Sequence, residues 1–347
     1  MRRCCPIRDV LTRDRKKVAD IALQGIDVRQ EEALSRAAVL RRLRLSDTVF
    51  RILTRSAALA VLALLGGVIF ALFAGAWPAL QKFGIGFITT ETWNPVTETF
   101  GGIAPIYGTI VTSIIAMVIA VPIGLMIALF LTELCPPSLR RPIGITIELL
   151  AGIPSIIYGI WGLFVLAPFL QQHVQPRIID AFGSVPVLST LFAGPPYGIG
   201  ILTASLILAI MVLPFITSIS RDVFDAVPPV LKEAAFGIGC TKWEVFRKIV
   251  MPYTRVGVIG GVMLGLGRAL GETMAVTFVI GNAHRISASI LAPGTTISAT
   301  IANEFTEAVG DIYTSSLIAL GLILFIITFF VLAAARYMLL RLERRIG

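Results

Sequence analysis

Residues 256–281 read VGVIGGVMLGLGRALGETMAVTFVIG, an apolar run that carries two charges, Arg268 and Glu272. At 1.5 Å per residue, a helix of about 20 apolar residues crosses the hydrocarbon core of a bilayer. The run therefore predicts a transmembrane helix. A charge at the centre of such a helix costs ~2.5–3.5 kcal/mol on insertion scales, so the two charges require a specific explanation.

The composition of the whole chain also indicates a membrane protein. Of the 347 residues, 56% are hydrophobic and 15% are charged, whereas soluble domains have about 45–50% apolar and about 25% charged residues. Mainly apolar segments of about 20 residues or more occur six times, at 56–77, 105–131, 143–168, 199–219, 256–281 and 315–338. We therefore predict an all-α membrane protein with six transmembrane helices. Residues 1–55 contain no apolar signal region, so the first span is expected to direct insertion.

The distribution of Lys and Arg predicts how the spans are oriented. Of the 30 basic residues, 26 lie on one side, in residues 1–55, at 140–141, in the loop 220–255 and in the C-terminal tail. The opposite loops contain Lys82, Arg177 and Arg285, and the last basic residue is Arg268. Because cytoplasmic loops carry the excess of Lys and Arg, both termini of this multi-pass protein are expected on the cytoplasmic side of the cell membrane. The net charge of +9 is thus a topology signal, and we expect no nucleic-acid partner.

These features divide the chain into a basic cytoplasmic N-terminal segment, 1–55, and a six-helix domain, 56–347, with a cytoplasmic loop at 220–255. No residue pattern in either part predicts an enzyme. The four cysteines, at 4, 5, 135 and 240, all lie on the predicted cytoplasmic side and lack the spacing of a metal site. We expect no catalytic residue and no metal. The chain also lacks the ATP-binding motif G-x-x-x-x-G-K-[ST], so we expect no cofactor of its own, and a partner ATPase or an ion gradient must supply the energy.

The loop 220–255 contains the residues of a helix–turn–helix. The proline pair at 228–229 suits the start of a helix, where a missing N–H costs nothing. Gly237 or Gly239 can supply the left-handed residue that ends this helix, and 241–244 (TKWE) fits a capping box that begins a second one. An amphipathic segment of this kind either docks into a partner's groove or lies in the lipid interface, and its shape favours neither.

Within this loop, Glu233-Ala234-Ala235, Gly239 and a final Ile-Val-Met-Pro at 249–252 resemble the EAA loop of bacterial ABC importer permeases. The usual form of that loop ends in Ile-x-Leu-Pro. In this chain Met251, another apolar residue, stands at the leucine position. The resemblance implies the type I permease fold of ABC importers. It also implies that Glu233, Ala234, Ala235, Gly239 and Pro252 belong to the coupling segment that inserts into a cleft of an ATPase subunit.

Four further stretches resemble one branch of that family, the C-type permeases of phosphate-specific importers. They are IAPIYGT (103–109), ALFLTEL (128–134), IELLAGIPSIIYGIWGLF (147–164) and GRALGETMAVTFVIGN (267–282). The resemblance covers about residues 56–347 and assigns no role to the basic segment before them, which is longer than usual in the family. It implies import of inorganic phosphate by alternating access, with the chain embedded in a lipid bilayer. The implied protein partners are an A-type permease subunit, two cytoplasmic subunits that use ATP and Mg, and an extracytoplasmic phosphate-binding protein.

The resemblance also places intramembrane residues implicated in transport at Arg268 and Glu272. Four residues apart in a helix, these side chains would share one face and reach each other. One interpretation is a buried structural ion pair, although the desolvation cost makes such pairs replaceable by apolar residues. The other is a transient phosphate site, in which the guanidinium fork of Arg268 binds the anion. Glu272 would then hold Arg268 in place and compete with phosphate, so that the cargo can leave.

Glu148 is a third acidic residue in an apolar stretch. We expect it either to pair with a basic group near the cytoplasmic face of the substrate pathway or to be a snorkelled interfacial acid. Prolines in or near the spans, at 122, 154 and 168, suggest broken helices.

The span around Arg268 also carries a stripe of small residues. Gly257, Gly261 and Gly265 repeat every four residues, and Gly267 and Gly271 repeat the spacing. This spacing lets helices approach closely. The stripe predicts a helix–helix seam, either with a second permease or within the chain.

Two other functions remain open at this stage. The first is the same architecture with another oxyanion, such as sulfate or molybdate, as cargo. The second is an ion-coupled secondary transporter, whose uptake would persist without a partner ATPase and would collapse with an ionophore.

Overall fold

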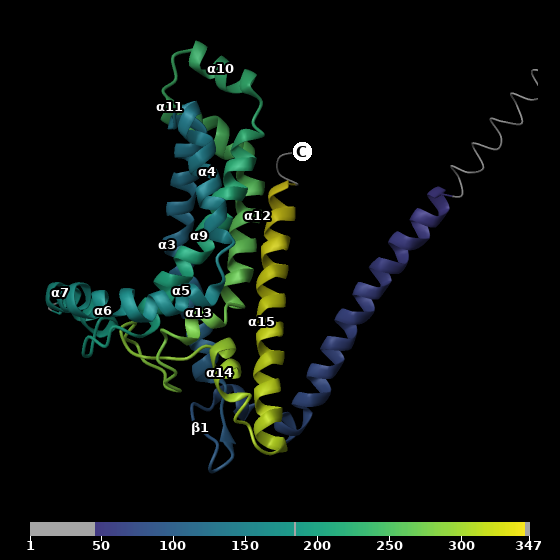
Figure 1. The fold of residues 1–347 in the computed structure, drawn as a ribbon, viewed down its shortest axis with the longest axis vertical. Helices are drawn as coiled ribbons and strands as arrows, with labels where there is room; N and C mark the ends of the chain where they lie inside the picture. Colours follow the sequence, from purple (N-terminus) through teal and green to yellow (C-terminus); the bar gives the residue numbers. More distant parts are fainter. Residues whose placement is uncertain (1–45, 184, 344–347) are drawn as a thin grey trace, which may run out of the picture. The chain divides into compact units, whose positions relative to one another are not determined.

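The computed structural model describes residues 46–183 and 185–343, so most of the segment 1–55 lies outside the described residues. The chain divides into two units, residues 1–70 and 71–347. The described part of the first unit is a single apolar helix, which continues across the boundary to Phe83. The remaining helices and strands belong to the second unit (Figure 1).

Six helices in the described residues are long and apolar enough to cross a bilayer, which confirms the predicted number of spans. They are Ser46–Phe83, Ile103–Leu134, Ser155–Phe182, Ile201–Asp225, Lys242–Leu270 and Asp311–Arg341.

Several of these long helices combine α-helical and π-helical segments. The α-helices after the first long helix are α2 (Gly86–Thr89), α3 (Ile103–Leu129), α4 (Pro137–Ala151), α5 (Ser155–Trp161), α6 (Ala167–Phe169), α7 (Gln175–Phe182), α8 (Pro186–Leu191), α9 (Ile201–Asp225), α10 (Pro229–Gly237), α11 (Lys242–Val245), α12 (Met251–Leu270), α13 (Met274–Thr277), α14 (Ile297–Glu304) and α15 (Asp311–Glu343). The π-helical segments are η1 (Phe130–Leu134), η2 (Gly162–Leu166), η3 (Leu170–Val174) and η4 (Phe246–Val250).

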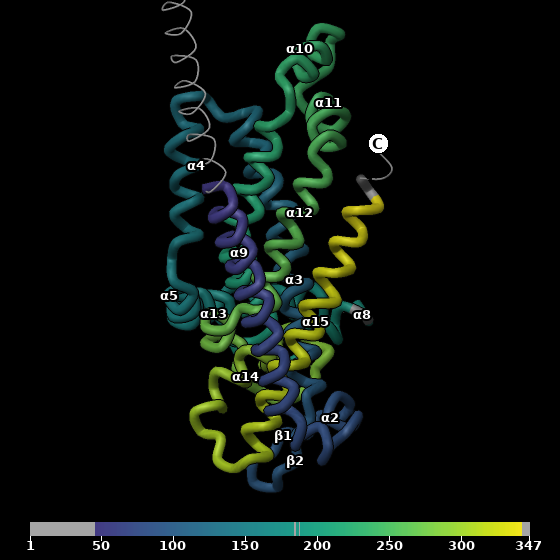
Figure 2. The backbone as a smooth tube through the Cα atoms, turned by 90° about the vertical axis from the view of Figure 1, so that its right-hand side faces the viewer, coloured from purple at the N-terminus to yellow at the C-terminus, as the bar shows by residue number. Residues whose placement is uncertain are grey.

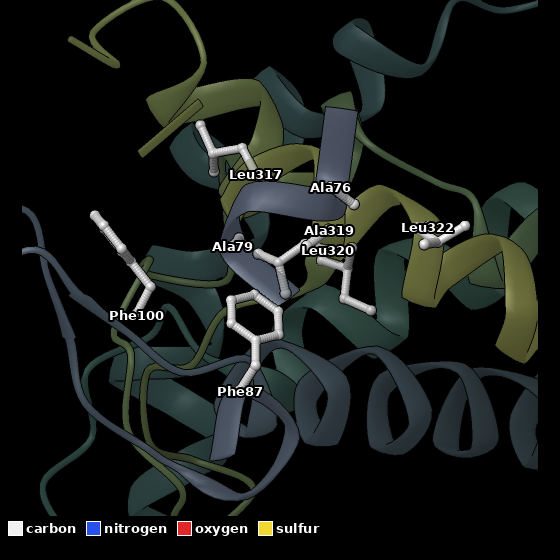
Figure 3. Close-up of a cluster of buried hydrophobic side chains, with 9 residues drawn as sticks. Ala76, Ala79, Phe87, Phe100, Leu317, Ala319, Leu320 and Leu322 are labelled. Atoms are coloured by element: carbon white, nitrogen blue, oxygen red, sulfur yellow. The ribbon is translucent and has the colours of Figure 1, made fainter. Parts of the chain in front are cut away.

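The described residues contain one feature that the all-α prediction did not include. Strands β1 (Trp93–Asn94) and β2 (Thr99–Phe100) form an antiparallel hairpin in which Trp93 lies opposite Phe100. Phe100 belongs to a buried apolar cluster with Phe87 of α2 and Leu317 and Leu320 of α15 (Figure 3). The cluster fixes the hairpin to the end of the second unit that lies away from α10 (Figures 1 and 2).

The third predicted span, 143–168, is wrong as a single helix. Helix α4 ends at Ala151, residues 152–154 are not helical, and α5 begins at Ser155. The physical reason is Pro154, which lacks an N–H and disfavours the helical conformation for Ile153 before it. After this break α5, α6 and α7 run across the direction of α4 (Figure 1), so the predicted segment combines parts of two differently directed helices.

Helix α9 is the central helix of the second unit. Helices α3, α4 and α12 all pack against it, and both views show α12 alongside it (Figures 1 and 2). The close approach of α12 depends on three of the predicted glycines. Cβ atoms at Gly257, Gly261 and Gly265 would lie 2.7–2.9 Å from side-chain atoms of Val223, Ile219 and Val212, all on α9. Of the two interpretations of the glycine stripe, packing within the chain is therefore correct for these three residues.

This packing predicts which glycine of α12 is sensitive to substitution. Gly261→Leu should separate α12 from α9 and lower the stability of the protein by about 1–3 kcal/mol, the usual cost of overpacking. Thermal unfolding of the purified protein in detergent measures this loss as a lower Tm. Gly260→Leu is the matched control, because a Cβ at Gly260 meets no atom within 4 Å. Equal Tm values for the two variants would contradict the close packing of α12 against α9 at Gly261.

Candidate functional site

Arg268 lies in the last turn of α12, on the surface of this chain. Its guanidinium carbon is 4.5 Å from the centroid of the Phe215 ring on α9. Such a cation–π contact contributes about 0.5–2 kcal/mol, depending on how far the cation is desolvated. Arg268 forms no ion pair within the described part of the chain. Its N–H donors therefore remain available to an anion.

Glu272 lies outside the helix that carries Arg268. Helix α12 ends at Leu270, and the Glu272 side chain accepts a hydrogen bond from the backbone N–H of Ala275, at 3.4 Å, in the short helix α13. The expectation that Arg268 and Glu272 share a helix face and pair is therefore wrong for this structure. The predicted continuous span 256–281 is wrong for the same reason, because the chain leaves the helical path at Gly271.

Glu148 is paired with a basic residue, as one of its two interpretations expected. Its carboxylate accepts a hydrogen bond from Arg221 at 2.6 Å, and this ion pair joins α4 to α9. Arg221 also contacts Asp222 at 3.1 Å, and Arg140 pairs with Asp225. The pairs line a cavity of about 520 Å³ in which three arginines face three acidic side chains. Whether phosphate passes Glu148 stays a prediction.

The loop between α9 and α12 has the local structure that its sequence predicts. Pro229 occupies the first turn of α10, and Gly239 has a φ of +88°, so the second of the two candidate glycines supplies the left-handed residue. The hydroxyl of Thr241 accepts the N–H of Glu244, and the Glu244 carboxylate accepts the N–H of Thr241. This capping box begins α11 as predicted.

The EAA residues divide between a buried side and an exposed side of this loop. Ala235 is buried in a cluster with Phe224 and Val250, whereas Glu233, Ala234, Gly239 and Pro252 are exposed. Large apolar side chains of the same loop are also exposed, among them Val230 at 69%, Ile238 at 82% and Trp243 at 57%. Clustered exposed apolar side chains mark interaction sites, either with protein or with membrane.

A largely buried ion pair attaches this loop to the span that contains α3, through residues far apart in sequence. Lys232 of α10 donates to the carboxylate of Glu133 at 2.5 Å, and the two side chains are only 17% and 14% exposed. Lys242 donates to the Glu133 backbone carbonyl at 3.3 Å. Because Glu133 lies in η1, which extends α3, the two lysines attach α10 and α11 to the end of that span.

At the hairpin end of the second unit, Glu304 joins three elements. Its carboxylate accepts hydrogen bonds from Trp93 of β1 at 2.6 Å, His284 at 2.8 Å and Tyr313 of α15 at 2.9 Å. Burial alone would raise the pKa of Glu304. The hydrogen bond and charge of His284, with the bonds from Tyr313 and Trp93, outweigh burial and lower this pKa below its ordinary value.

Comparison with known proteins identifies relatives over nearly the whole chain. The family described as binding-protein-dependent transport system inner membrane component matches residues 120–344. A phosphate transport system permease protein PstC from Mesorhizobium japonicum is 71% identical over 313 residues, which cover 90% of this chain and 96% of the relative. The PstC protein of Pasteurella multocida is 54% identical, over 87% of this chain and 94% of its own length.

Solved structures of ABC transporters share the fold. A bacterial alginate ABC transporter in complex with an alginate-bound periplasmic protein matches with a TM-score of 0.53 at 20% identity, over 83% of this chain and 94% of that chain. An inward-facing MetNI methionine ABC transporter matches with a TM-score of 0.51 at 16% identity, over 69% of this chain and 95% of that chain. These similarities confirm the predicted importer-permease fold.

The Glu133–Lys232 contact predicts a double-mutant cycle. Lys232→Met leaves the Glu133 carboxylate buried without its partner, which should cost about 3 kcal/mol, whereas combining it with Glu133→Gln should restore part of this loss. Thermal unfolding of the four proteins measures the coupling. Lys248→Met is the control, since its pair with Glu244 spans 3.6 Å between exposed side chains and contributes little. Additive effects of the two substitutions would contradict a stabilising pair.

The lowered pKa of Glu304 predicts a loss of stability in acid. Because the folded pKa is lower than the unfolded one, ~4.3, the carboxylate contributes stability above that value and loses it as the pH falls through the folded pKa. Thermal unfolding should therefore show a Tm that falls as the pH drops below ~4.3, and Glu304→Gln should make this fall smaller. Glu307→Gln, which removes an exposed carboxylate three residues later, should keep the wild-type pH dependence. Identical pH profiles for both variants would rule out this contribution.

Proposed function

We propose that this chain, which belongs to the family of binding-protein-dependent transport system inner membrane components, is the permease subunit of an ABC importer for inorganic phosphate. The observation that carries the proposal is the 71% identity with a phosphate permease over 90% of the chain. Relatives named for phosphate favour this cargo over sulfate or molybdate, and they favour an ABC importer over a secondary transporter. The chain is a transport subunit and not the catalytic subunit of the complex.

The assembly that we propose contains four kinds of subunit. This chain pairs with an A-type permease, and two cytoplasmic subunits hydrolyse ATP with Mg²⁺. An extracytoplasmic phosphate-binding protein delivers the anion. Both termini and the loop 220–255 lie on the cytoplasmic side of the cell membrane, and the hairpin end faces outward. The distribution of Lys and Arg supports this orientation.

In this assembly, the coupling surface for the ATPase is the exposed side of the loop between α9 and α12. Glu233, Ala234 and Gly239 lie there, and the apolar side chains of Ile238 and Trp243 are large enough to fill a cleft in a partner. A partner that pushes on α10 moves α3 through the Lys232–Glu133 contact. It moves α12 through the continuous helical path from α11 to Leu270.

Arg268 is the residue that we propose to meet phosphate within the membrane. Its guanidinium lies on the surface of the chain, where a second permease can enclose a pathway, and it is not occupied by a carboxylate. Planar N–H donors match two oxygens of a tetrahedral oxyanion, and arginine keeps its charge at any physiological pH. The contact with Phe215 positions the guanidinium while leaving its edges free.

Replacement of Arg268 tests this role. Arg268→Gln should reduce phosphate uptake at least tenfold, because a charge-assisted hydrogen bond contributes about 1.5–3 kcal/mol. Uptake of radiolabelled phosphate into cells or vesicles with all subunits present measures the loss, and co-purification checks that the ATPase subunits still bind. Arg341→Gln is the matched control, since Arg341 makes a similar contact, 4.7 Å from the Tyr337 ring. Normal uptake by Arg268→Gln would exclude Arg268 from the pathway.

The same uptake assay distinguishes phosphate from sulfate as the cargo, and ATP from an ion gradient as the energy source. Excess unlabelled phosphate should abolish uptake of the label, whereas excess sulfate should not. Loss of the partner ATPase should also abolish uptake, and an ionophore should leave it unchanged when ATP is supplied. Sulfate that outcompetes phosphate, or uptake that needs only an ion gradient, would overturn the proposed function.

A further inference from the structure

A cavity of about 340 Å³ lies between two loops of the second unit, residues 193–197 and 283–293. The second loop continues the chain beyond α13, so it follows the segment that carries Arg268 and Glu272. The cavity volume is many times the ~30 Å³ share of one water molecule in the liquid. It therefore has room for a small anion together with water.

The side chains of this cavity offer hydrogen-bond donors and no carboxylate. Arg285 lines it and forms no ion pair within the described residues. Ser287 accepts the N–H of Ser289 at 3.1 Å, which leaves its own O–H to donate, and the phenol of Tyr197 also lines the cavity. A cavity with one full positive charge, two hydroxyl donors and no acidic side chain is suited to an anion.

Backbone contacts hold the loop that carries Arg285 in a defined shape. The hydroxyl of Tyr107 on α3 donates to the carbonyl of Ser287 at 2.9 Å, and the N–H of Ile290 donates to Leu191 at 3.0 Å. At one end of the loop Gly281 has a φ of +90°, and a Cβ there would lie 2.7 Å from Pro293. The donors are thus presented by a positioned backbone, which reduces the ordering cost of binding.

Three other cavities and one other cation of the second unit differ from this site. In the cavity beside Glu148, three acidic side chains balance three arginines, so it carries no net charge. Two further cavities have apolar walls. Lys82, another of the three basic residues in the predicted external loops, is already paired with Glu98 at 2.9 Å. Arg285 therefore combines two features, a free positive charge and an enclosing cavity.

We propose that this cavity is a binding site for phosphate on its way to Arg268, with Arg285 as the main ligand and Ser287 and Tyr197 as further donors. The inference rests on the proposed function, because it names a second site for the same cargo. The carboxylate of Glu91 accepts the N–H of Ile286, next to Arg285, at 2.6 Å, and Glu307 lies on a neighbouring loop; both acidic side chains repel a phosphate anion. A local guanidinium offsets this repulsion where the anion leaves solution.

Chemical modification tests binding directly. Phenylglyoxal reacts with accessible arginines, and mass spectrometry of peptides from the full importer complex in lipid nanodiscs gives the rate at each residue. Inorganic phosphate, without the binding protein, should slow modification of Arg285 at least fivefold relative to chloride at equal ionic strength. Arg177 on α7, also exposed and free of an ion pair in the described residues, should react at an unchanged rate.

Equal modification rates for Arg285 in phosphate and in chloride would overturn the proposal. Protection that requires the binding protein would also overturn it, and would make Arg285 a contact of that protein.

Uptake then tests whether this site lies on the transport route. In the complete importer, Arg285→Gln should lower the rate of phosphate uptake about tenfold, and Arg285→Lys should lower it less, because lysine keeps the charge and loses the fork. Arg177→Gln removes one positive charge from a predicted external loop and should behave like the wild type. Similar uptake by the Arg285→Gln and Arg177→Gln variants would overturn the proposed route. Failure of the wild-type complex to take up phosphate would instead overturn the proposed function.

Discussion

Helix α12 lies close to α9 because Gly257, Gly261 and Gly265 present no side chain to it. The seam makes the two helices one mechanical element. Helix α9 leads into the loop that contains α10, and α12 leaves that loop and continues for 20 residues, or about 30 Å, to the turn that carries Arg268. In the proposed importer, a displacement of α10 would therefore act on both helices at once.

How well each feature could be predicted depends on the range of the interactions that create it. The capping box at Thr241 and the start of α10 at Pro229 arise from groups within a few residues of each other, so the sequence contains the full cause. The number of apolar spans follows from composition in the same way. The ends of those spans follow only in part. Pro154 is a local signal for the break after α4, whereas apolar residues continue on both sides of Gly271 and no proline marks the end of α12. The Lys232–Glu133 contact joins residues 99 positions apart and has no local signal.

The distribution of paired and unpaired charges fits a pathway for an anion. Glu133, Glu148 and Glu304 each contact a basic side chain, which reduces their repulsion of a phosphate anion. In the described residues, Arg268 and Arg285 have no carboxylate partner. The lack of a partner is not specific to these two residues, since Arg177 is also unpaired in the described residues. Arg268 differs in lying on an aromatic ring and Arg285 in lining a cavity, and the anion binding that we propose would use both features.

In the phosphate site that we propose at Arg268, the Phe215 ring would also set how strongly the cargo is held. A carboxylate partner would offer the guanidinium the same charge-assisted, two-oxygen contact that phosphate offers, so every passing anion would have to displace an equal competitor. An aromatic face attracts the cation by only about 0.5–2 kcal/mol and leaves the in-plane N–H donors free. Glu272, whose carboxylate contacts the backbone of α13, does not compete in this arrangement. In the proposed site, release would then depend on weak binding, because conduction needs a contact that the cargo can leave.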